Sequence, residues 1–362
     1  MRVLILHGPN LNLLGARQPE IYGSMTLAQL EERIIAWGTG MGLDTSFVQT
    51  NSEGSLIDAI QESETDALLI NPGALTHTSR AIGDAILARG LPTVEVHISD
   101  IYSREPWRSV SLIAASCVRS IVGRGIGGYR DALRHLVNRS AVDTVTIAYG
   151  PTNDHVAELR RPVGEPIGAV VLIHGGFWLR QWERDGLESL AVDLTRRGFL
   201  TWNVEYRRLG TGGGWPGSAH DVETAIGHLT RELPALGHLN LLGHSAGGYL
   251  AQWAGGRRPL SVRTSVVGLA AVTDLSLLAA NEGPGSREAQ TLLDSGAPPR
   301  ISPRGDTILI HGEADELVPV AQATRMEDAV DVEVVSGLGH FDLLDPARAH
   351  WEGVVSRLMR TG

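Results

Sequence analysis

The chain has 362 residues, more than one hydrophobic core usually serves, and this length predicts two domains. Its formal net charge of −10 argues against nucleic acid or an anionic membrane as a partner, and no apolar run approaches the roughly 18 residues of a membrane span. No signal-peptide pattern precedes the first apolar run, so we expect a cytoplasmic protein.

Some residue types are absent or rare, and this excludes several kinds of chemistry. The chain contains no lysine, which rules out Schiff-base catalysis, pyridoxal phosphate and a Walker-type phosphate loop. No H-E-x-x-H or similar spacing suggests a metal site, so we expect neither metal nor cofactor. The single cysteine, Cys117, lies in an apolar run and is interpreted as a core residue, with a reactive thiol as the alternative.

Over the first 140 residues, short apolar runs alternate with longer helical patterns. The predicted strands are residues 2–6, 45–48, 67–70, 93–96 and 118–122. The predicted helices are residues 26–41, 55–63, 78–89 and 128–137. This alternation predicts an α/β fold with a doubly wound parallel sheet of flavodoxin type, which binds ligands at the carboxyl ends of its strands.

Three of these strands end in polar clusters, at residues 7–10, 71–77 and 97–100. The predicted sheet brings the three clusters together at one edge. Arg104 and Arg108, on the loop after the fourth strand, can add positive charge to the same edge. We therefore expect a small-molecule substrate that carries a carboxylate and hydroxyl groups.

The segments LILHGPNLNLLGARQPEIYG, INPGALTHTS, EVHISD and REPWR together resemble the type II 3-dehydroquinate dehydratases. The resemblance implies that 3-dehydroquinate loses water to give 3-dehydroshikimate through an enolate, with Tyr22 as base and His97 as acid. It implies that Arg17 lowers the pKa of Tyr22 from its reference value of about 10, and that Asn10 steadies the enolate oxygen. Glu95 shares a strand face with His97 and is expected to orient its ring.

The same resemblance implies the residues that bind substrate: Asn71 and the backbone of Ile98 and Ser99 for the carboxylate, and His77, Asp84 and Arg108 for the ring hydroxyls. Asp100 stands where the family usually has asparagine, which places an extra negative charge beside an acidic substrate. The resemblance also implies a homo-oligomer built from trimers, with the dodecamer as one form.

Three alternatives remain open for this first domain. Thr76 and His77 are candidates for helix caps rather than site residues. Residues 123–128 match G-x-G-x-x-G, a dinucleotide-binding pattern, although no second βαβ unit or ribose-binding carboxylate follows. A domain that binds a ring acid as a sensor, without converting it, is the third alternative.

A boundary is predicted near residue 141, which gives domains at residues 1–141 and 142–362. Residues 138–143 are polar and are interpreted as the junction, and a new strand follows at 144–148. Further strands are predicted at 239–242, 307–310 and 332–335, and a helix is predicted at 248–254.

Ser245 lies in a G-x-S-x-G motif between an apolar strand and a helical pattern, which is the context of a nucleophile elbow. Asp315 and His340 each follow a predicted strand, so the order Ser, Asp, His matches that of α/β-hydrolases. In this triad His340 would deprotonate Ser245 and Asp315 would fix the ring's tautomer, while the amides of Gly176 and Ala246 would form an oxyanion hole.

The segments HGGFW and GHSAGG resemble kynurenine formamidase-like and small esterase members of the α/β-hydrolases. The resemblance implies hydrolysis of a small ester or formamide, and the short segment 274–306 leaves room for only a small cap. Three further histidines are expected to support the oxyanion loop, the elbow and the acid loop, respectively His174, His244 and His311. Two alternatives remain: hydrolysis of acyl esters of quinate or shikimate that feeds the dehydratase, and a catalytically silent assembly module.

Overall fold

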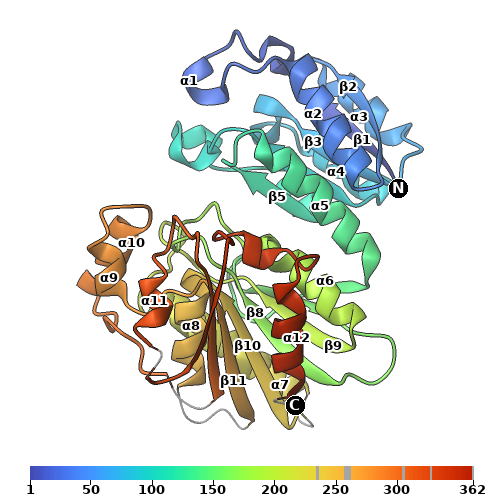
Figure 1. Cartoon of the computed structure of the whole chain (residues 1–362). Helices are drawn as coiled ribbons and strands as arrows, with labels where there is room; N and C mark the ends of the chain where they lie inside the picture. The colour runs from blue at the N-terminus through green and yellow to red at the C-terminus, as the bar shows by residue number, and fades with distance from the viewer. Residues whose placement is uncertain (234–235, 257–261, 304–305, 327, 361–362) are drawn as a thin grey trace. The chain divides into compact units, whose positions relative to one another are not determined.

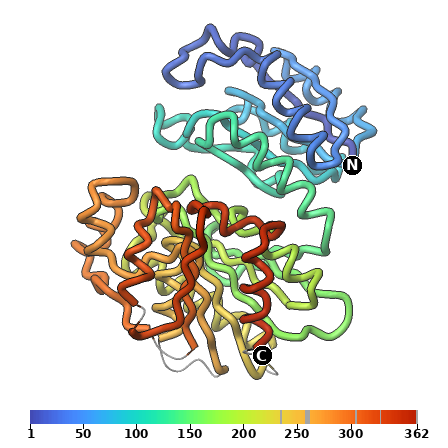
Figure 2. The backbone as a smooth tube through the Cα atoms, in the orientation of Figure 1, coloured from blue at the N-terminus to red at the C-terminus, as the bar shows by residue number. Residues whose placement is uncertain are grey.

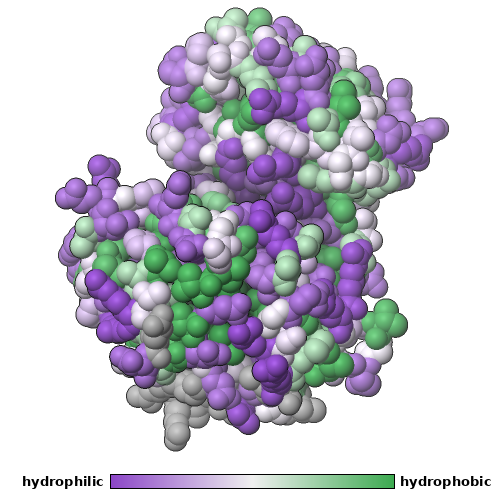
Figure 3. Space-filling view, viewed as in Figure 1, coloured by the Kyte–Doolittle hydropathy of each residue, from purple (hydrophilic) through white to green (hydrophobic). Residues whose placement is uncertain are grey.

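The computed structural model describes residues 1–233, 236–256, 262–303, 306–326 and 328–360. The chain divides into two compact units, Met1–Ser140 and Ala141–Gly362. Each unit is continuous in sequence. In Figure 2 the tube is coloured from blue to green in the first unit and from green to red in the second. Among the described residues no helix is long and apolar enough to cross a membrane, and hydrophilic residues cover much of each unit's visible face (Figure 3).

The described residues of the first unit form a five-stranded sheet in the order β2-β1-β3-β4-β5, and all its strand pairs are parallel. Its strands are β1 (Arg2–His7), β2 (Asp44–Gln49), β3 (Ala67–Asn71), β4 (Thr93–His97) and β5 (Arg119–Val122). This is the strand order of flavodoxin-like folds, so the predicted strands and fold class are confirmed.

Helices cover both faces of this sheet because its strands are buried on both sides (Figure 1). In β1, Val3 and Ile5 pack toward helices α2 (Leu27–Gly40) and α5 (Gly127–Ala141). The alternate residues of β1 pack toward α3 (Glu53–Gln61) and α4 (Arg80–Arg89) on the other face.

One local prediction for this unit was wrong. The prediction ended the last helix at residue 137, but α5 continues to Ala141, so polar residues of the expected junction belong to the helix. The four-residue helix α1 (Pro19–Tyr22), which begins at a proline suited to the first helical position, was not predicted. Short 3-10 helices also occur in this unit, at Leu11–Leu13, Gly73–His77, Ile101–Ser103, Pro106–Arg108 and Ala114–Ser116.

The described residues of the second unit form an eight-stranded sheet in the order β13-β12-β11-β10-β8-β9-β7-β6. Its strands are β6 (Thr144–Ala148), β7 (Val156–Arg160), β8 (Gly168–Ile173), β9 (Phe199–Val204), β10 (His238–His244), β11 (Arg263–Leu269), β12 (Asp306–Gly312) and β13 (Asp331–Val335). Strand β7 runs antiparallel to both of its neighbours, and the other pairs are parallel. All strands that the sequence predicted here are confirmed.

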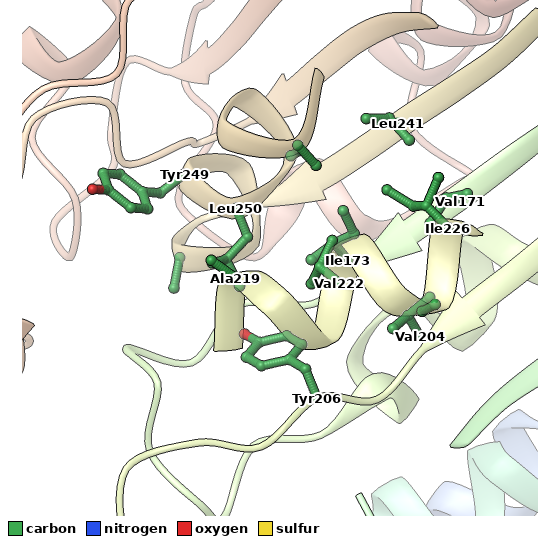
Figure 4. Close-up of a cluster of buried hydrophobic side chains, with 14 of the residues drawn as sticks. Val171, Ile173, Val204, Tyr206, Ala219, Val222, Ile226, Leu241, Tyr249 and Leu250 are labelled. Carbon is green, nitrogen blue, oxygen red and sulfur yellow. The ribbon is translucent and has the colours of Figure 1, made fainter. Parts of the chain in front are cut away.

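Helices also cover both faces of the second sheet. Helices α7 (Gly217–Glu232) and α8 (Ala246–Gly255) pack on one face, and α6 (Glu188–Arg196) and α12 (His350–Arg360) pack on the other. Figure 4 shows side chains of α7 and α8 packed beside those of β8 and β10 in the larger core. The remaining helices are α9 (Leu275–Ala279), α10 (Ser286–Asp294) and α11 (Ala321–Thr324), with 3-10 helices at Arg184–Leu187 and Asp342–Leu344.

Strand β3 lies at the centre of the first sheet, so truncation of its buried side chains is expected to be costly. Leu69 is fully buried, whereas Leu87 on α4 is 63% exposed. We expect Leu69→Ala to lower the free energy of unfolding by about 2–5 kcal/mol, because it leaves a cavity, and Leu87→Ala to change it by less than about 0.5 kcal/mol. Urea titration of both variants measures the difference, and equal losses would contradict this account of the core.

Candidate active sites

His97 lies at the carboxyl end of β4, and its ring is held by a buried carboxylate. Nε2 of His97 is 2.8 Å from Oε1 of Glu95, as the shared strand face predicted. The Glu95 carboxylate also accepts hydrogen bonds from three hydroxyl groups, those of Thr76, Ser111 and Ser120. Burial raises the pKa of Glu95, but the hydrogen bond and charge of His97 and the hydroxyl donors outweigh burial and hold that pKa below its usual range.

The contacts of Thr76 and His77 decide one of the open alternatives. The side chain that caps α4 is that of Ser79, which accepts a hydrogen bond from the Ile82 amide. Thr76 instead binds Glu95, so the helix-cap interpretation of Thr76 and His77 was wrong. The ring of His77 stacks 6.5 Å from that of His97, and burial lowers the pKa of His77.

Tyr22 lies between two guanidinium groups. Arg104 donates a hydrogen bond of 2.6 Å from Nη1 to the Tyr22 hydroxyl oxygen, and the Cζ atom of Arg17 lies 5.3 Å from the Tyr22 ring centre. The resemblance singled out Arg17, whereas the direct hydrogen bond comes from Arg104, which the sequence suggested only as a source of charge. Tyr22 and Arg104 are 82 positions apart, and no local pattern in the sequence connects them.

Arg104 and Arg108 connect the surroundings of Tyr22 with those of His97. Both arginines pair with Glu105, at 3.5 and 2.8 Å. The guanidinium of Arg108 lies 4.0 Å from the ring centre of Trp107, which in turn contacts the His77 ring edge to face at 5.3 Å. A continuous chain of contacts therefore runs from Tyr22 to His77, beside His97.

Asn71 lies at the carboxyl end of β3 and donates a hydrogen bond of 3.0 Å from Nδ2 to the hydroxyl of Tyr129. The sequence did not single out Tyr129. Its hydroxyl nevertheless fixes the side-chain amide of Asn71, which the resemblance assigns to substrate binding. Burial raises the pKa of Tyr129, which keeps its proton on the oxygen. His7 is another polar residue inside the fold. It is fully buried and lies opposite Asn71 in the sheet.

Ile98 and Ser99 follow β4 directly, and the glycine-rich turn after β5 closes on them. The amides of Gly123 and Gly125 donate to the carbonyl oxygens of His97 and Ile98, at 3.1 and 3.0 Å. These amides of the G-x-G-x-x-G segment are thus engaged within the protein, which argues against the dinucleotide-site alternative.

Three further residues singled out in this unit, Asn10, Asp84 and Asp100, have different surroundings from those described above. Asn10 is exposed with φ of +67°, and its backbone amide donates to Oδ1 of Asn51. Asp84 is exposed on α4. Oδ1 of Asp100 accepts a hydrogen bond from the Tyr102 amide, so part of its charge caps the short helix Ile101–Ser103.

Cys117 is partly buried at the edge of the core in the same unit. Burial and the nearby charge of Glu95 raise the pKa of the Cys117 thiol. A raised pKa disfavours the thiolate, so the interpretation of Cys117 as a core residue holds better than that of a reactive thiol.

In the second unit, Ser245 lies between β10 and α8 in a strained turn with φ of +53° and ψ of −120°. The turn requires glycine on either side, because a Cβ at Gly247 would lie 2.0 Å from the carbonyl oxygen of Ile173. Within the described residues, Oγ of Ser245 is buried and has no hydrogen-bond partner. An unsatisfied buried hydroxyl is unusual in a structural serine, and it suits a nucleophile that bonds its partner during reaction.

Asp315 and His340 are brought together as predicted. Nδ1 of His340 is 2.7 Å from Oδ2 of Asp315, while Oδ1 accepts from the amides of Leu317 and Val318. His311 supports the same loop through Val318 and lies 3.3 Å from the carboxylate. Burial raises the pKa of Asp315, but the hydrogen bonds of His311 and His340 outweigh it and hold that pKa well below its usual range.

The loop after β8 lies against Ser245, as an oxyanion loop requires. A Cβ at Gly175 would lie 2.7 Å from Cβ of Ser245, and Gly176 has a φ of +106° that strongly favours glycine. Ala246 follows the nucleophile as the first residue of α8, where backbone amides have no partner within the helix. Both amides proposed from the sequence are therefore in segments beside Ser245.

Aromatic side chains surround this centre. Phe341, 52% exposed, lies beside His340, and its ring stacks 6.0 Å from that of Trp182. His244 contacts His340 from the other side, with ring centres 4.6 Å apart, and burial holds the pKa of His244 well below its usual range. His244 is thus a neutral support for the elbow, in agreement with its predicted role.

The cap predicted from residues 274–306 is small. It contains α9 and α10, and Gly285 at the start of α10 packs against the Phe177 ring of the oxyanion loop. The Trp215 ring, from the glycine-rich loop before α7, contacts Trp253 at 4.7 Å. Within the described residues no group of three or more His, Cys, Asp or Glu side chains is placed to hold a metal.

The first unit is similar in sequence to known proteins. The family described as Dehydroquinase class II matches residues 1–137. A 3-dehydroquinate dehydratase of Pelotomaculum thermopropionicum is 47% identical over 136 residues, which cover 37% of this chain and 94% of that protein. Catabolic 3-dehydroquinase 1 of Aspergillus fumigatus is 46% identical over 136 residues, which cover 37% of this chain and 91% of that protein.

For the second unit, the family described as BD-FAE matches residues 159–293. The crystal structure of esterase B from Lactobacillus rhamnosis superposes with a TM-score of 0.53 at 19% identity, covering 64% of this chain and 90% of that one. At this identity the likeness is one of fold. The predicted α/β-hydrolase fold of the second unit is confirmed.

Because the pKa of Glu95 is lowered, we expect the contribution of this residue to the stability of the fold to depend on pH. A carboxylate whose folded pKa is below its unfolded value stabilises the fold above the unfolded value, near 4.3, and loses that contribution as the pH falls. Glu95→Gln should therefore melt several degrees below the unmodified protein at pH 7, and the difference should shrink below about pH 4.5. Thermal unfolding at several pH values measures this, with exposed Glu62→Gln as control; a difference independent of pH would contradict it.

Proposed function

The chain belongs, through residues 1–137, to the class II dehydroquinases, and we propose that this unit converts 3-dehydroquinate to 3-dehydroshikimate with Tyr22 as base and His97 as acid. The observation that carries the proposal is the contact chain from Tyr22 and its two arginines to the buried pair of His97 and Glu95. The proposal is supported by this series of contacts because it links a phenol and an imidazole, the two groups that the reaction needs.

In the first step, the Tyr22 oxygen removes a proton from the carbon beside the ketone, and an enolate forms. The guanidinium groups of Arg104 and Arg17 stabilise the negative charge that resides on the Tyr22 oxygen before this transfer. Asn10 steadies the enolate oxygen, which develops its charge in the same step.

In the second step, the ring hydroxyl leaves as water after it receives a proton from His97. Because Nε2 is bonded to Glu95, Nδ1 is the nitrogen that delivers this proton. Asn71 and the backbone amides of Ile98 and Ser99 bind the substrate carboxylate, where a carboxylate oxygen needs several donors.

Further substrate contacts come from His77 and Arg108 to the ring hydroxyls. We propose that Asp84, which is exposed on α4, also contributes to binding the ring hydroxyls. We propose further that the chain forms a homo-oligomer built from trimers, in which the dodecamer is one form. No bound cofactor is required by either step.

We propose that the second unit is a serine hydrolase of a small ester or formamide. Ser245 attacks the carbonyl carbon while His340 takes the hydroxyl proton, and Asp315 holds the imidazolium that results. The amides of Gly176 and Ala246 bind the oxyanion, and His340 then protonates the leaving group. The short cap with α9 and α10 favours a modest acyl group.

The dehydratase proposal predicts distinct effects at Tyr22 and Arg104. Tyr22→Phe removes the base, so formation of the ultraviolet-absorbing enone should fall by at least about 10²- to 10⁴-fold, while substrate affinity changes little. Arg104→Gln keeps an amide donor but loses the charge, and a smaller fall in kcat is expected. Full activity of Tyr22→Phe would overturn the proposal, and binding without turnover by the unmodified protein would favour the sensor.

The hydrolase proposal predicts covalent labelling at one residue. A serine-directed phosphonate should label the unmodified protein but not Ser245→Ala, and N-formylkynurenine, short nitrophenyl esters and an acylated quinate then serve as competing substrates. Selective turnover of the acylated quinate would mean that the two units act in sequence on one metabolite. No labelling and no turnover would leave the second unit as an assembly module.

A further inference from the structure

His174 differs from the other histidines of the second unit because both of its ring nitrogens face acceptors. Nδ1 is 2.8 Å from the carbonyl oxygen of Gly175, and Nε2 is 2.9 Å from Oε1 of Glu205. A carbonyl oxygen has no proton to donate. Burial raises the pKa of Glu205, but the charges of Arg208, His174 and Arg184 outweigh it and hold that pKa well below its usual range, so this carboxylate also only accepts. His174 is thus held between two fixed acceptors, one on the oxyanion loop and one on Glu205.

A second buried histidine of this unit provides the contrast. Nε2 of His155 is 2.9 Å from Oδ1 of Asp221, but Nδ1 of His155 accepts a hydrogen bond of 3.3 Å from the amide of Thr152. One ring nitrogen donates and the other accepts, which a neutral ring satisfies. His174 thus differs from His155 in having an acceptor at each ring nitrogen.

The surroundings of the His174 ring hold it in one position. Glu205 is fully enclosed and also accepts from the Arg184 amide at 3.0 Å and from the Arg208 guanidinium. The Tyr206 ring stacks on the imidazole at 4.3 Å, and its hydroxyl donates to the His174 carbonyl at 2.8 Å. Burial raises the pKa of Tyr206, so that hydroxyl keeps its proton. Each group that faces the ring or its peptide is therefore fixed by a second bond.

The hydrogen bond to Gly175 acts on the peptide group that carries the Gly176 amide. The carbonyl of residue 175 and the N–H of residue 176 belong to one planar trans peptide and point in opposite directions. A ring N–H bonded to the carbonyl fixes the plane of this peptide and polarises its N–H, which strengthens a hydrogen bond formed on the far side.

We propose that His174, with Glu205 as its hydrogen-bond partner, is a positioning residue that fixes and polarises the 175–176 peptide so that the Gly176 amide binds the oxyanion. The inference rests on the proposed hydrolase function of this unit. The oxyanion exists only in the transition state and the tetrahedral intermediate, so the effect belongs in kcat and not in KM. His174 itself touches neither substrate nor the reacting atoms.

The test uses the full chain and two neutral variants, His174→Gln and Glu205→Gln. Turnover of a short nitrophenyl ester gives kcat and KM, and phenylboronic acid, which forms a tetrahedral adduct with a nucleophilic serine, reports on the oxyanion hole at equilibrium. We expect kcat to fall by about 10- to 100-fold, somewhat less than for loss of an oxyanion donor, with KM changed by less than about threefold. The affinity for the boronic acid should fall by the same factor as kcat.

His155→Gln is the matched control, because it removes a buried histidine that is bonded to a carboxylate but does not lie on the oxyanion loop. It should lower the melting temperature without changing kcat or boronic acid affinity. The double variant His174→Gln/Glu205→Gln should lose no more than either single variant, since the two residues act as one pair. If one single variant fails to fold, the other carries the test.

Three results would overturn the inference: an unchanged kcat in both single variants, an equal loss of boronic acid affinity in His155→Gln, or additive losses in the double variant. An unmodified protein without turnover or phosphonate labelling would instead overturn the hydrolase proposal, and this inference would fall with it. An active unmodified protein with equally active variants overturns the inference alone.

Discussion

A buried carboxylate bonded to a histidine ring is the interaction on which each candidate centre of this chain depends. It occurs between Glu95 and His97, between Asp315 and His340, and between Glu205 and His174. Taking a carboxylate out of water is costly unless hydrogen bonds replace its hydration. The structure supplies these bonds from hydroxyl groups around Glu95, from backbone amides around Asp315, and from arginines around Glu205. The cost of burial is thus offset locally, and each ring is left with one orientation.

Two parallel sheets place these pairs where chemistry can occur. In the first unit, the neighbouring strands β1, β3 and β4 end at the same edge, so the polar residues that follow them converge without long-range guidance. In the second unit, Ser245 follows β10 at the same kind of edge, and the loop after the adjacent β8 packs against it. The central strands that carry these residues are buried on both faces, which makes the edge rigid enough to hold bonds within hydrogen-bonding distance.

The sequence predicted those features that follow from local patterns. Short β-branched or apolar runs of four or five residues located the strands, and the glycine spacing around Ser245 located the elbow, because each pattern meets a backbone requirement nearby in the chain. It did not predict the hydrogen bond from Arg104 to Tyr22 or that from Asn71 to Tyr129, because the partners lie on separate elements far apart in sequence. The cap of α4 was left open for a similar reason. Thr76 and Ser79 are both plausible caps locally, and only the tertiary bond to Glu95 distinguishes them.

The two proposed reactions share an electrostatic requirement that a chain without lysine meets in particular ways. Each needs negative charge stabilised on an oxygen, on Tyr22 as the base in the first reaction and on the tetrahedral intermediate in the second. A flexible ammonium would bring charge to such an oxygen as a point, whereas the planar guanidinium of Arg104 donates to the Tyr22 oxygen in a fixed direction. His174 acts instead through a peptide group. Both side chains are held in place before reaction by carboxylates, Glu105 for Arg104 and Glu205 for His174, so little reorganisation is needed during the reaction.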